Sequence, residues 1–341
     1  MPVLATSCQH RSPLIWGLIV STLIVCAAPV TLPGQTPGQS TGPLFEKLRW
    51  ARLELVMGRL ELRDIRRGQN RSITVNQHET GIREHISFRI DGNKLLLHYE
   101  RQSPEGTLVL DANGRRTISV RQTPATADKP TIQFHQDAKQ VRLLVGDDDS
   151  QQYMADHLWL LLLQHPAPCR SHLVPLLESL RQDWHFGRSA EAVESNLVRA
   201  AGNPLPMDAN KLHLQIDKLG HGTFRQRQAA DMAIRKMGQP VVGYLSELDD
   251  SQLNAEQRLR LRRICASLLH RHGDSTLSVT IWLQSSPSAW LCMMQHEDAT
   301  VRGQAQLRLA TLLGRPVPFD PADPADKRAS QIASIREKLL R

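Results

Sequence analysis

The chain contains few aromatic residues and few cysteines. Its 341 residues include six tryptophans, six phenylalanines and three tyrosines, so few rings are present on which nucleic-acid bases could stack. Two of the five cysteines, Cys8 and Cys26, fall within the first 28 residues, and the other three show no C-x-x-C spacing. An odd number of cysteines without paired spacing does not support a disulfide framework.

Recognisable catalytic and metal-binding motifs are also absent. The sequence has no H-E-x-x-H, no G-x-S-x-G, no P-loop and no dinucleotide-binding fingerprint. His157 and His165 have no partner at the usual zinc spacing, and the aspartates at 147–149 lack the distal glutamate of a calcium loop. We therefore expect no catalytic residue, no cofactor and no bound metal, and no small-molecule substrate is identifiable. An enzyme with scattered active-site residues is an alternative.

Charge of one sign is not concentrated in a tract. The 42 basic and 34 acidic residues are mixed along the chain and leave a net charge of +8. Dispersed positive charge is typical of a solvated surface, whereas nucleic-acid binding usually needs basic residues clustered on one face. We therefore expect no nucleic-acid partner. The alternative is a cytosolic helical protein that binds nucleic acid through contacts between its cationic helices and the phosphates.

The N-terminus carries the clearest localisation signal. An apolar run from Leu14 to Ala28 follows His10 and Arg11 and is interrupted only by one glycine, one serine and one threonine. Such a run predicts a signal peptide or a membrane anchor over residues 1–28. Residues 29–44 are rich in proline, glycine, serine and glutamine, which predicts a flexible linker. We expect the protein to be exported across, or anchored in, the cytoplasmic membrane.

Residues 45–150 show alternating apolar and polar positions, which predict an antiparallel β-meander. Turn sequences separate the alternating segments and predict three hairpins, at residues 85–99, 107–120 and 131–145. A further strand is expected near Ile73 to Val75. Residues 45–62 are ambiguous between helix and strand. Two apolar segments, Tyr153 to Leu163 and Leu173 to Leu180, are predicted helices that cover the sheet. They belong to a helical connection over residues 151–203.

Residues 204–341 contain a helical pattern that occurs three times. Each copy begins with a short polar capping residue, has an arginine four positions later, and continues with apolar residues at helical spacing. The caps are Thr223, Asn254 and Asp298, and the arginines are Arg227, Arg258 and Arg302. Each copy also has a candidate first helix before it, so the pattern predicts helix pairs.

The run Asp298-Ala-Thr-Val-Arg302-Gly-Gln-Ala305 resembles the opening of the second helix in HEAT/armadillo-type repeats. The resemblance covers the C-terminal part of the chain only. This part is similar to exported bacterial HEAT-like proteins. The resemblance implies an all-α repeat region, a scaffold that serves many kinds of partner; an ordinary irregular helical domain is the alternative. The predicted fold class is therefore α+β, with a β-meander and covering helices followed by a HEAT-like region.

One helix of this region predicts a binding surface. At about 100° per residue, Arg260, Arg263 and Arg271 fall on the face turned away from Leu261, Cys265 and Leu268. Three exposed arginines suit another protein with acidic groups or an anionic membrane surface; the competing interpretation is that they only solvate the face and pair with Glu256. The predicted function is a non-enzymatic, exported or membrane-tethered interaction module.

Further expectations concern the packing of the repeat. Six apolar residues are expected to share one helical core, namely Ile234, Leu261, Ile264, Leu268, Leu309 and Leu312. Gln306 and Arg308 are expected to tolerate substitution. A last helix is predicted to begin with Asp323 as its cap and Pro324 in its first turn, and its apolar stripe is expected to seal the stack.

Overall fold

The computed structural model of the chain describes residue 48 and residues 51–63, 70–91, 94–147, 150–268 and 273–339. All of them belong to one compact unit, residues 42–341. The predicted signal or anchor segment at 1–28 and the linker at 29–44 lie outside the described residues. No helix in the described ranges has both the length and the apolar character needed to cross a membrane.

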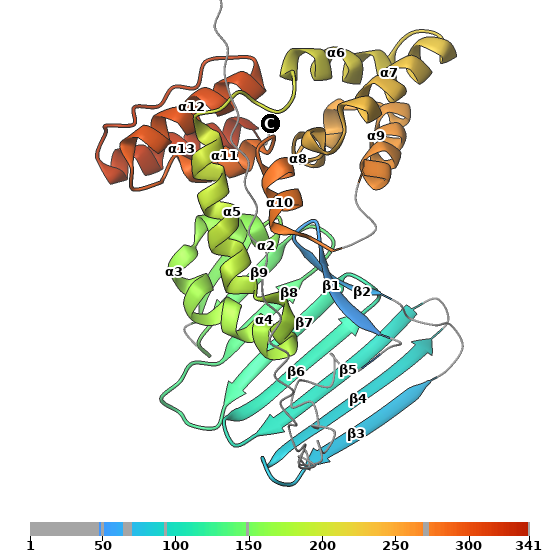
Figure 1. Ribbon diagram of the computed structural model, residues 1–341, viewed down its shortest axis with the longest axis vertical. Helices are drawn as coiled ribbons and strands as arrows, with labels where there is room; N and C mark the ends of the chain where they lie inside the picture. The colour runs from blue at the N-terminus through green and yellow to red at the C-terminus, as the bar shows by residue number, and fades with distance from the viewer. Residues whose placement is uncertain are drawn as a thin grey trace, which may run out of the picture. The chain divides into compact units, whose positions relative to one another are not determined.

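An eight-stranded antiparallel sheet forms the first half of the unit (Figure 1). Its strands follow one another in space in the order of the chain, which is the predicted meander. They are β3 (Arg71–Gln77), β4 (Ile82–Asp91), β5 (Lys94–Ser103), β6 (Gly106–Asn113), β7 (Thr117–Pro124), β8 (Ile132–Gln136), β9 (Val141–Val145) and β10 (Gln151–Ala155). With the helical region that follows, the α+β prediction is confirmed.

Strand β10 corrects the predicted start of the first covering helix. Tyr153 does not begin a helix but pairs with Leu143 in the sheet, where its ring joins the apolar face. The helix α2 (Leu158–Gln164) begins after His157, whose Nδ1 accepts from the amide of Leu160 at 3.2 Å. A continuous apolar stretch does not reveal by periodicity where a buried strand ends and a buried helix begins.

The ambiguous segment at 45–62 contains a two-stranded hairpin, β1 (Arg52–Val56) and β2 (Arg59–Arg63). Met57 and Gly58 form its turn with φ of 54° and 65°, as a two-residue turn with the twist of the strands requires. Leu53, Leu60 and Leu62 are fully buried. The hairpin therefore contributes to the core rather than to a linker.

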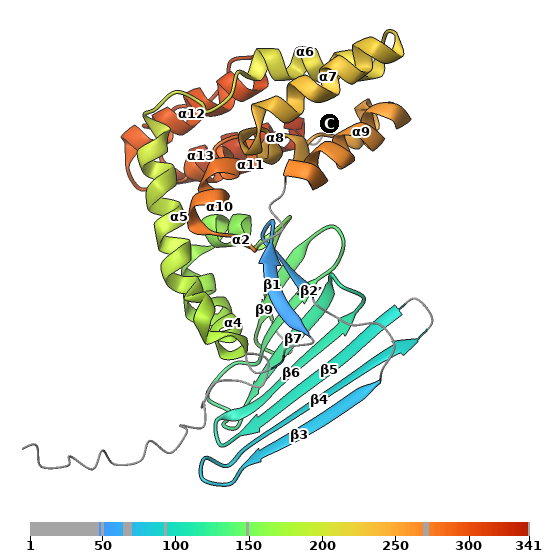
Figure 2. The same cartoon turned by 45° about the vertical axis from the view of Figure 1, so that its right-hand side comes forward.

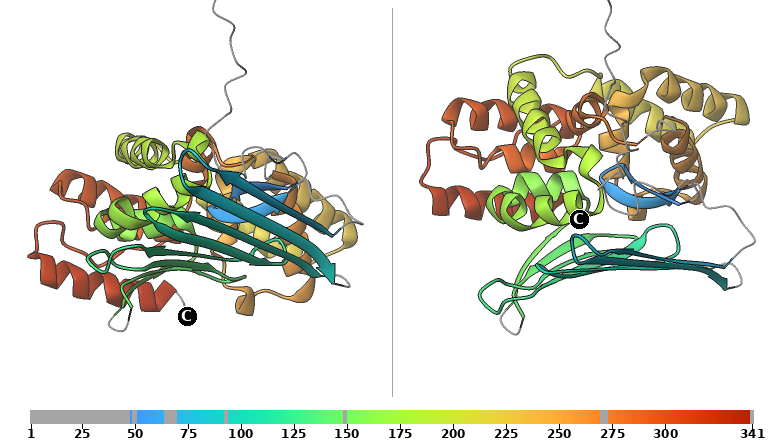
Figure 3. Two further views of the ribbon diagram at one scale, coloured as in Figure 1. Left: turned by 90° about the horizontal axis from the view of Figure 1, so that it is seen from below. Right: turned by 60° about the horizontal axis from the view of Figure 1, so that its bottom comes forward.

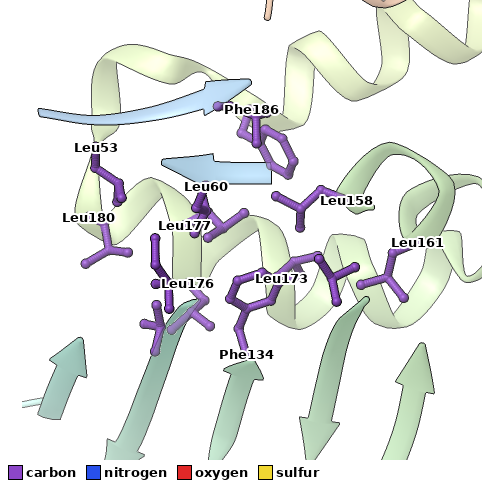
Figure 4. Close-up of a cluster of buried hydrophobic side chains, with 14 of the residues drawn as sticks. Leu53, Leu60, Phe134, Leu158, Leu161, Leu173, Leu176, Leu177, Leu180 and Phe186 are labelled. Atoms are coloured by element: carbon purple, nitrogen blue, oxygen red, sulfur yellow. The ribbon is translucent and has the colours of Figure 1, made fainter. Parts of the chain in front are cut away.

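The first core lies between the apolar face of the sheet and the elements packed on it. Helices cover this face, including α2, α3 (Pro166–Pro168) with the π-helical turn Cys169–Leu173, and α4 (Val174–Leu180). Leu173, Leu176 and Leu177 point from these helices toward Phe134 of β8 and Leu60 of β2 (Figure 4). Burial of this continuous apolar surface stabilises the sheet, because the opposite face of the same strands is polar.

The second core is formed by helices, with Met207, Val317 and Phe319 added from the segments between them. It joins residues of α6 (Ala209–Gly220), α7 (Phe224–Met237), α8 (Val242–Ser246), α9 (Ala255–Leu268), α11 (Pro287–Met293), α12 (Ala299–Leu313) and α13 (Ala325–Leu339). Helix α5 (Phe186–Ala201) connects the two cores. The six apolar residues expected to share a helical core all belong to it, with Leu268 only partly buried.

The predicted caps and arginines have local roles at the helix starts. Thr223 and Asn254 form reciprocal capping pairs with Gln226 and Gln257, and Asp298 accepts from the amide of Thr300 at 2.7 Å. The side chain of Arg227 donates to the carbonyl of Gly222 at 2.7 Å. Arg302 similarly donates to the carbonyls of His296 and Glu297, at 2.8 and 2.7 Å. In these two copies the repeated arginine thus binds the loop that precedes its helix.

The long step between the second and third copies contains an additional helix, α10 (Thr276–Leu283). Its Val279, Trp282 and Leu283 are buried in the first core, not the second. The last helix also differs in detail from the prediction, since Asp323 binds the side chains of Lys327 and Gln331 (2.9 and 2.8 Å) instead of a helix amide. Ile332 and Ile335 are buried in the second core, as the seal requires.

The structure revises the expectation that Gln306 and Arg308 tolerate substitution. Arg308 Nε donates to the carbonyl of Ala201 in the last turn of α5 at 3.0 Å, and burial lowers the pKa of its guanidinium. Gln306 Nε2 donates to the carbonyls of Val317 and Phe319, at 2.9 and 2.8 Å. Both side chains thus join α12 to backbone carbonyls of other segments.

Replacing Arg308 by alanine should lower the free energy of unfolding by about 1–2 kcal/mol, because the terminal carbonyls of α5 lose a charged donor. Urea unfolding of the full chain measures the change. Arg315→Ala is the matched control, since Arg315 is exposed in the loop after α12 and should cost less than about 0.5 kcal/mol. Equal, small losses for both variants would contradict the role of Arg308.

Candidate functional site

The candidate site is the outer surface of α7 and α9, which lie side by side (Figures 1 and 2). The two capping pairs fix where each helix begins. Gln257 also donates to the carbonyl of Ile216 at 3.0 Å in a buried position, which ties the start of α9 to α6. The orientation of α9 is therefore held by a hydrogen bond to α6 as well as by apolar packing.

The buried side of each helix determines which residues face solvent. Helix α7 buries Ala230 and Ile234, and α9 buries Gln257, Leu261 and Ile264. The core line of α9 thus runs through Ile264, whereas Cys265 is only partly buried. The buried stripe of α9 is thus rotated about the helix axis relative to the predicted stripe, and the exposed face is rotated with it.

Arg260 does not lie on an open face, which corrects the predicted arginine surface. Its side chain is 14% exposed and lies against α7. Nε donates to Glu256 at 2.6 Å, Nη1 is 3.9 Å from an Asp231 oxygen, and the guanidinium lies 5.8 Å from the centre of the Phe224 ring. For Arg260, the alternative prediction of pairing with Glu256 therefore agrees with the structure.

The other two predicted arginines have different outcomes. Arg263 is exposed on α9, on the same outward side as Leu259 and Arg262. Arg271 lies outside the described residues. The three arginines are therefore not shown to form one surface, and the exposed cations of this region are others.

Positive charge is concentrated on the two helices. Together α7 and α9 carry eight basic residues and only two carboxylates, Asp231 and Glu256. Both carboxylates already have partners, because Arg235 and Arg260 bind Asp231 while Arg227 and Arg260 bind Glu256. Within the described part of the chain, no carboxylate forms an ion pair with three exposed cations, namely Arg225, Lys236 and Arg263.

Large apolar side chains are exposed between these cations. Phe224 and Met232 on α7 are 65% and 61% exposed, and Leu259 on α9 is 46% exposed. Phe224 contacts the guanidinium of Arg260, which links the apolar and cationic groups across the two helices. We call this surface, defined by Phe224, Arg225, Met232, Lys236, Leu259 and Arg263, the α7–α9 face. Sequence periodicity alone missed its contribution from α7.

The α7–α9 face can bind but has no group suited to catalysis. It holds no histidine, cysteine or free carboxylate within the described residues. Elsewhere in the described ranges, no group of three histidine, cysteine or acidic side chains is placed to hold a metal ion. Cys169 and Cys292 are buried, and burial raises the pKa of both thiols to about 12, so neither is a reactive thiolate at neutral pH.

No known protein-family model matches the chain, and searches of curated proteins and of solved structures likewise find no match.

Proposed function

We propose that the protein is a non-enzymatic interaction module of the cell envelope whose α7–α9 face binds an acidic segment of another protein. One observation carries the proposal: unpaired cations and exposed apolar side chains occur together on two packed helices. Large exposed patches of this mixed kind mark interaction surfaces. Arginine, methionine and aromatic residues are also the types enriched at protein interfaces.

The arrangement of the helices supports the proposal that this region is a HEAT-like repeat. Helix α6 packs on α7, α8 on α9, and α11 on α12, which are the three helix pairs expected for such repeats. Helices α7 and α9 also pack on one another. Stacked helix pairs of this type present extended surfaces to their partners.

A protein partner is favoured over nucleic acid and over a lipid surface. A guanidinium donates two parallel hydrogen bonds to a carboxylate, which gives arginine a geometric preference for acidic side chains. The α7–α9 face has one exposed aromatic ring, Phe224, so it offers little stacking for bases. Anionic lipid is the competing ligand, because basic and apolar residues also bind membrane interfaces.

Export of the chain is part of the same proposal. The basic start and the apolar run within residues 1–28 support it. Cell fractionation distinguishes an envelope protein from the cytosolic alternative.

Reversing the charge of Arg225, Lys236 and Arg263 together to glutamate should abolish partner capture by this face. A photo-crosslinking residue at Gln228, which lies exposed on α7, reports contact directly in native envelopes. We expect the wild-type chain to crosslink to a protein with an acidic segment, and the triple variant to lose at least about 90% of the product at low salt. The melting temperature should barely change, because all three cations are exposed.

The matched control reverses three exposed cations elsewhere, Lys129, Lys139 and Arg188, and should retain the crosslink. Equal loss in both variants would indicate a nonspecific effect of net charge and contradict the proposal. Binding of the wild type to anionic vesicles, without any protein product, would instead identify a lipid-binding face. Binding to DNA that weakens steeply with salt would support the nucleic-acid alternative.

A further inference from the structure

A row of polar side chains crosses the outer face of the eight-stranded sheet. Each member is the direct cross-strand partner of the next, so the row runs perpendicular to the strands: Ser72, Ser87, His98, Asp111, Ser119 and His135, one from each of β3 to β8. Residues on this face alternate with the buried core residues of the same strands. The register of five strand pairs therefore creates the row.

The row lies in a hollow of about 640 Å³ on this face. All six residues line it, together with Asn70, Arg89, Leu96, Asn113 and Thr117. The helices lie on the opposite side of the sheet (Figure 3), and no described element covers the hollow. Its volume falls in the range of ligand sites, although it is open to solvent.

The chemistry of the hollow selects a neutral ligand rich in hydroxyl groups. Serine hydroxyls both donate and accept, and a sugar hydroxyl needs both kinds of partner. His98 Nδ1 lies 2.7 Å from Asp111 Oδ1, so the carboxylate at the centre of the row is already paired. Charges of both signs line the hollow, from Arg71, Arg89 and Asp111, so it presents no surface of a single sign to a polyanion. Phe88 borders the hollow but is buried in the core, and among the described residues no outward side chain of this face carries a phenyl, phenol or indole ring on which bases could stack.

Hydrolytic chemistry at this row is disfavoured, although Ser87, His98 and Asp111 are neighbours on β4, β5 and β6. A serine nucleophile needs a hydrogen bond to its histidine and free amides that form an oxyanion hole. Among the described residues Ser87 forms no hydrogen bond with His98, and β5 is paired along both edges with β4 and β6. Its backbone amides are used in the sheet, so the row can bind but lacks an oxyanion hole.

The spacing of the row indicates an extended chain as the ligand. Neighbouring strands lie about 4.8 Å apart, so the six side chains span about 24 Å. An extended polypeptide rises only about 3.3 Å per residue and falls out of step with the row. In a stretched β-linked polysaccharide each sugar extends the chain by the length of one pyranose ring. This length is comparable with the distance between two neighbouring strands. Each sugar can then meet the side chain of one strand.

We propose that this hollow binds an extended, uncharged polysaccharide, which lies across the strands with one sugar over each polar side chain of the row. The site is on the sheet and is independent of the α7–α9 face. It gives the β-meander a binding role of its own.

Binding of soluble β-1,4-linked oligomers of N-acetylglucosamine or glucose by the full chain tests the proposal, with isothermal titration calorimetry as the measurement. The affinity should rise with oligomer length up to about the hexamer, while a monosaccharide should not bind detectably. Ser119→Val and Asp111→Ala should each weaken hexamer binding by about tenfold, because each removes a hydrogen-bonding partner.

Thr123→Val is the matched control for Ser119→Val. Thr123 is exposed on the same strand and the same face but lies outside the hollow, and its replacement should leave the affinity unchanged. Circular dichroism and melting temperature confirm that each variant is folded. Absence of binding by the wild type, equal weakening by Ser119→Val and Thr123→Val, or a preference for dextran sulfate that salt removes would each overturn the proposal.

Discussion

Replacement of Asp274 by alanine should destabilise the protein by about 3–5 kcal/mol. Its carboxylate accepts three hydrogen bonds, from the amides of Met57 and Gly58 at 2.8 and 2.6 Å and from Trp159 Nε1 at 2.7 Å. Burial raises the pKa of this carboxyl group, and the same three donors oppose the increase. Removing the acceptor leaves three donors without partners in a partly buried position, at about 1–3 kcal/mol each before relaxation.

The position of Asp274 explains the size of the effect. It joins the β1–β2 turn to α2, and its own amide donates to the carbonyl of Leu55 at 2.6 Å. The turn packs closely at this point, because a Cβ at Gly58 would lie 2.9 Å from both His157 and Trp159. Asp274 also lines a hollow of about 290 Å³, through which water can reach the donors, so the expected loss is smaller than the sum for three unsatisfied donors.

Equilibrium unfolding in urea measures the change. Asp298→Ala is the control, since Asp298 is an ordinary helix cap at the surface, where it accepts from the amide of Thr300, and its loss should cost about 1 kcal/mol. If both variants lose the same stability, Asp274 is an ordinary cap and the three-donor contact is unimportant.

Glu247→Gln should make the protein more stable at pH 8 and have little effect near pH 4.5. Burial raises the pKa of Glu247 to about 7, and the nearby Asp156 adds to the increase. Its hydrogen bonds with the Ser286 hydroxyl and the Ser288 amide, the latter at 2.8 Å, lower the pKa but do not cancel the effect of burial. The folded state therefore favours the protonated carboxyl group.

The direction of the pH dependence follows from that difference. A carboxyl group with a raised pKa in the folded state contributes its stability below its ordinary pKa of about 4.5, and loses it as pH rises through about 7. The glutamine amide remains neutral at both pH values. At pH 8 the variant therefore retains up to about 3 kcal/mol of unfolding free energy that the wild type has lost. Unfolding curves at both pH values, for wild type and variant, measure the difference.

Glu191→Gln is the control, because Glu191 is exposed on α5 and its replacement should change stability equally at both pH values. A Glu247→Gln variant that is no more stable than the wild type at pH 8 would show that Glu247 is ionised without cost in the folded state.

Local signals predicted much of the fold correctly. The hairpin joining β6 and β7 follows from alternation on both sides of Asn113 and Gly114, and α7 begins at the predicted cap Thr223. Such signals depend on neighbours in the chain, which the sequence displays directly. The error at Tyr153 arose where an apolar strand and an apolar helix adjoin, because neither shows the polar alternation that separates them.

The candidate sites were harder to predict because they depend on two or more elements. Arg260 was expected on an open face because α9 was considered alone, whereas α7 packs against that flank and supplies Asp231 and Phe224. The polar row on the sheet was missed for the same reason. His98 and Asp111 are separated by twelve residues, and only the register of β5 and β6 places them side by side.

The sequence by itself determined the meander strands β4 to β9, the helices α7, α9 and α12 with their caps, and the separation of a sheet from a helical region. These features arise from interactions within a few residues, so their pattern is visible along the chain. Only the tertiary structure decided which cations are paired, which carboxylates are buried and which polar groups meet. Those properties depend on distance and desolvation between segments far apart in sequence, as Asp274 shows by binding an amide 217 residues away.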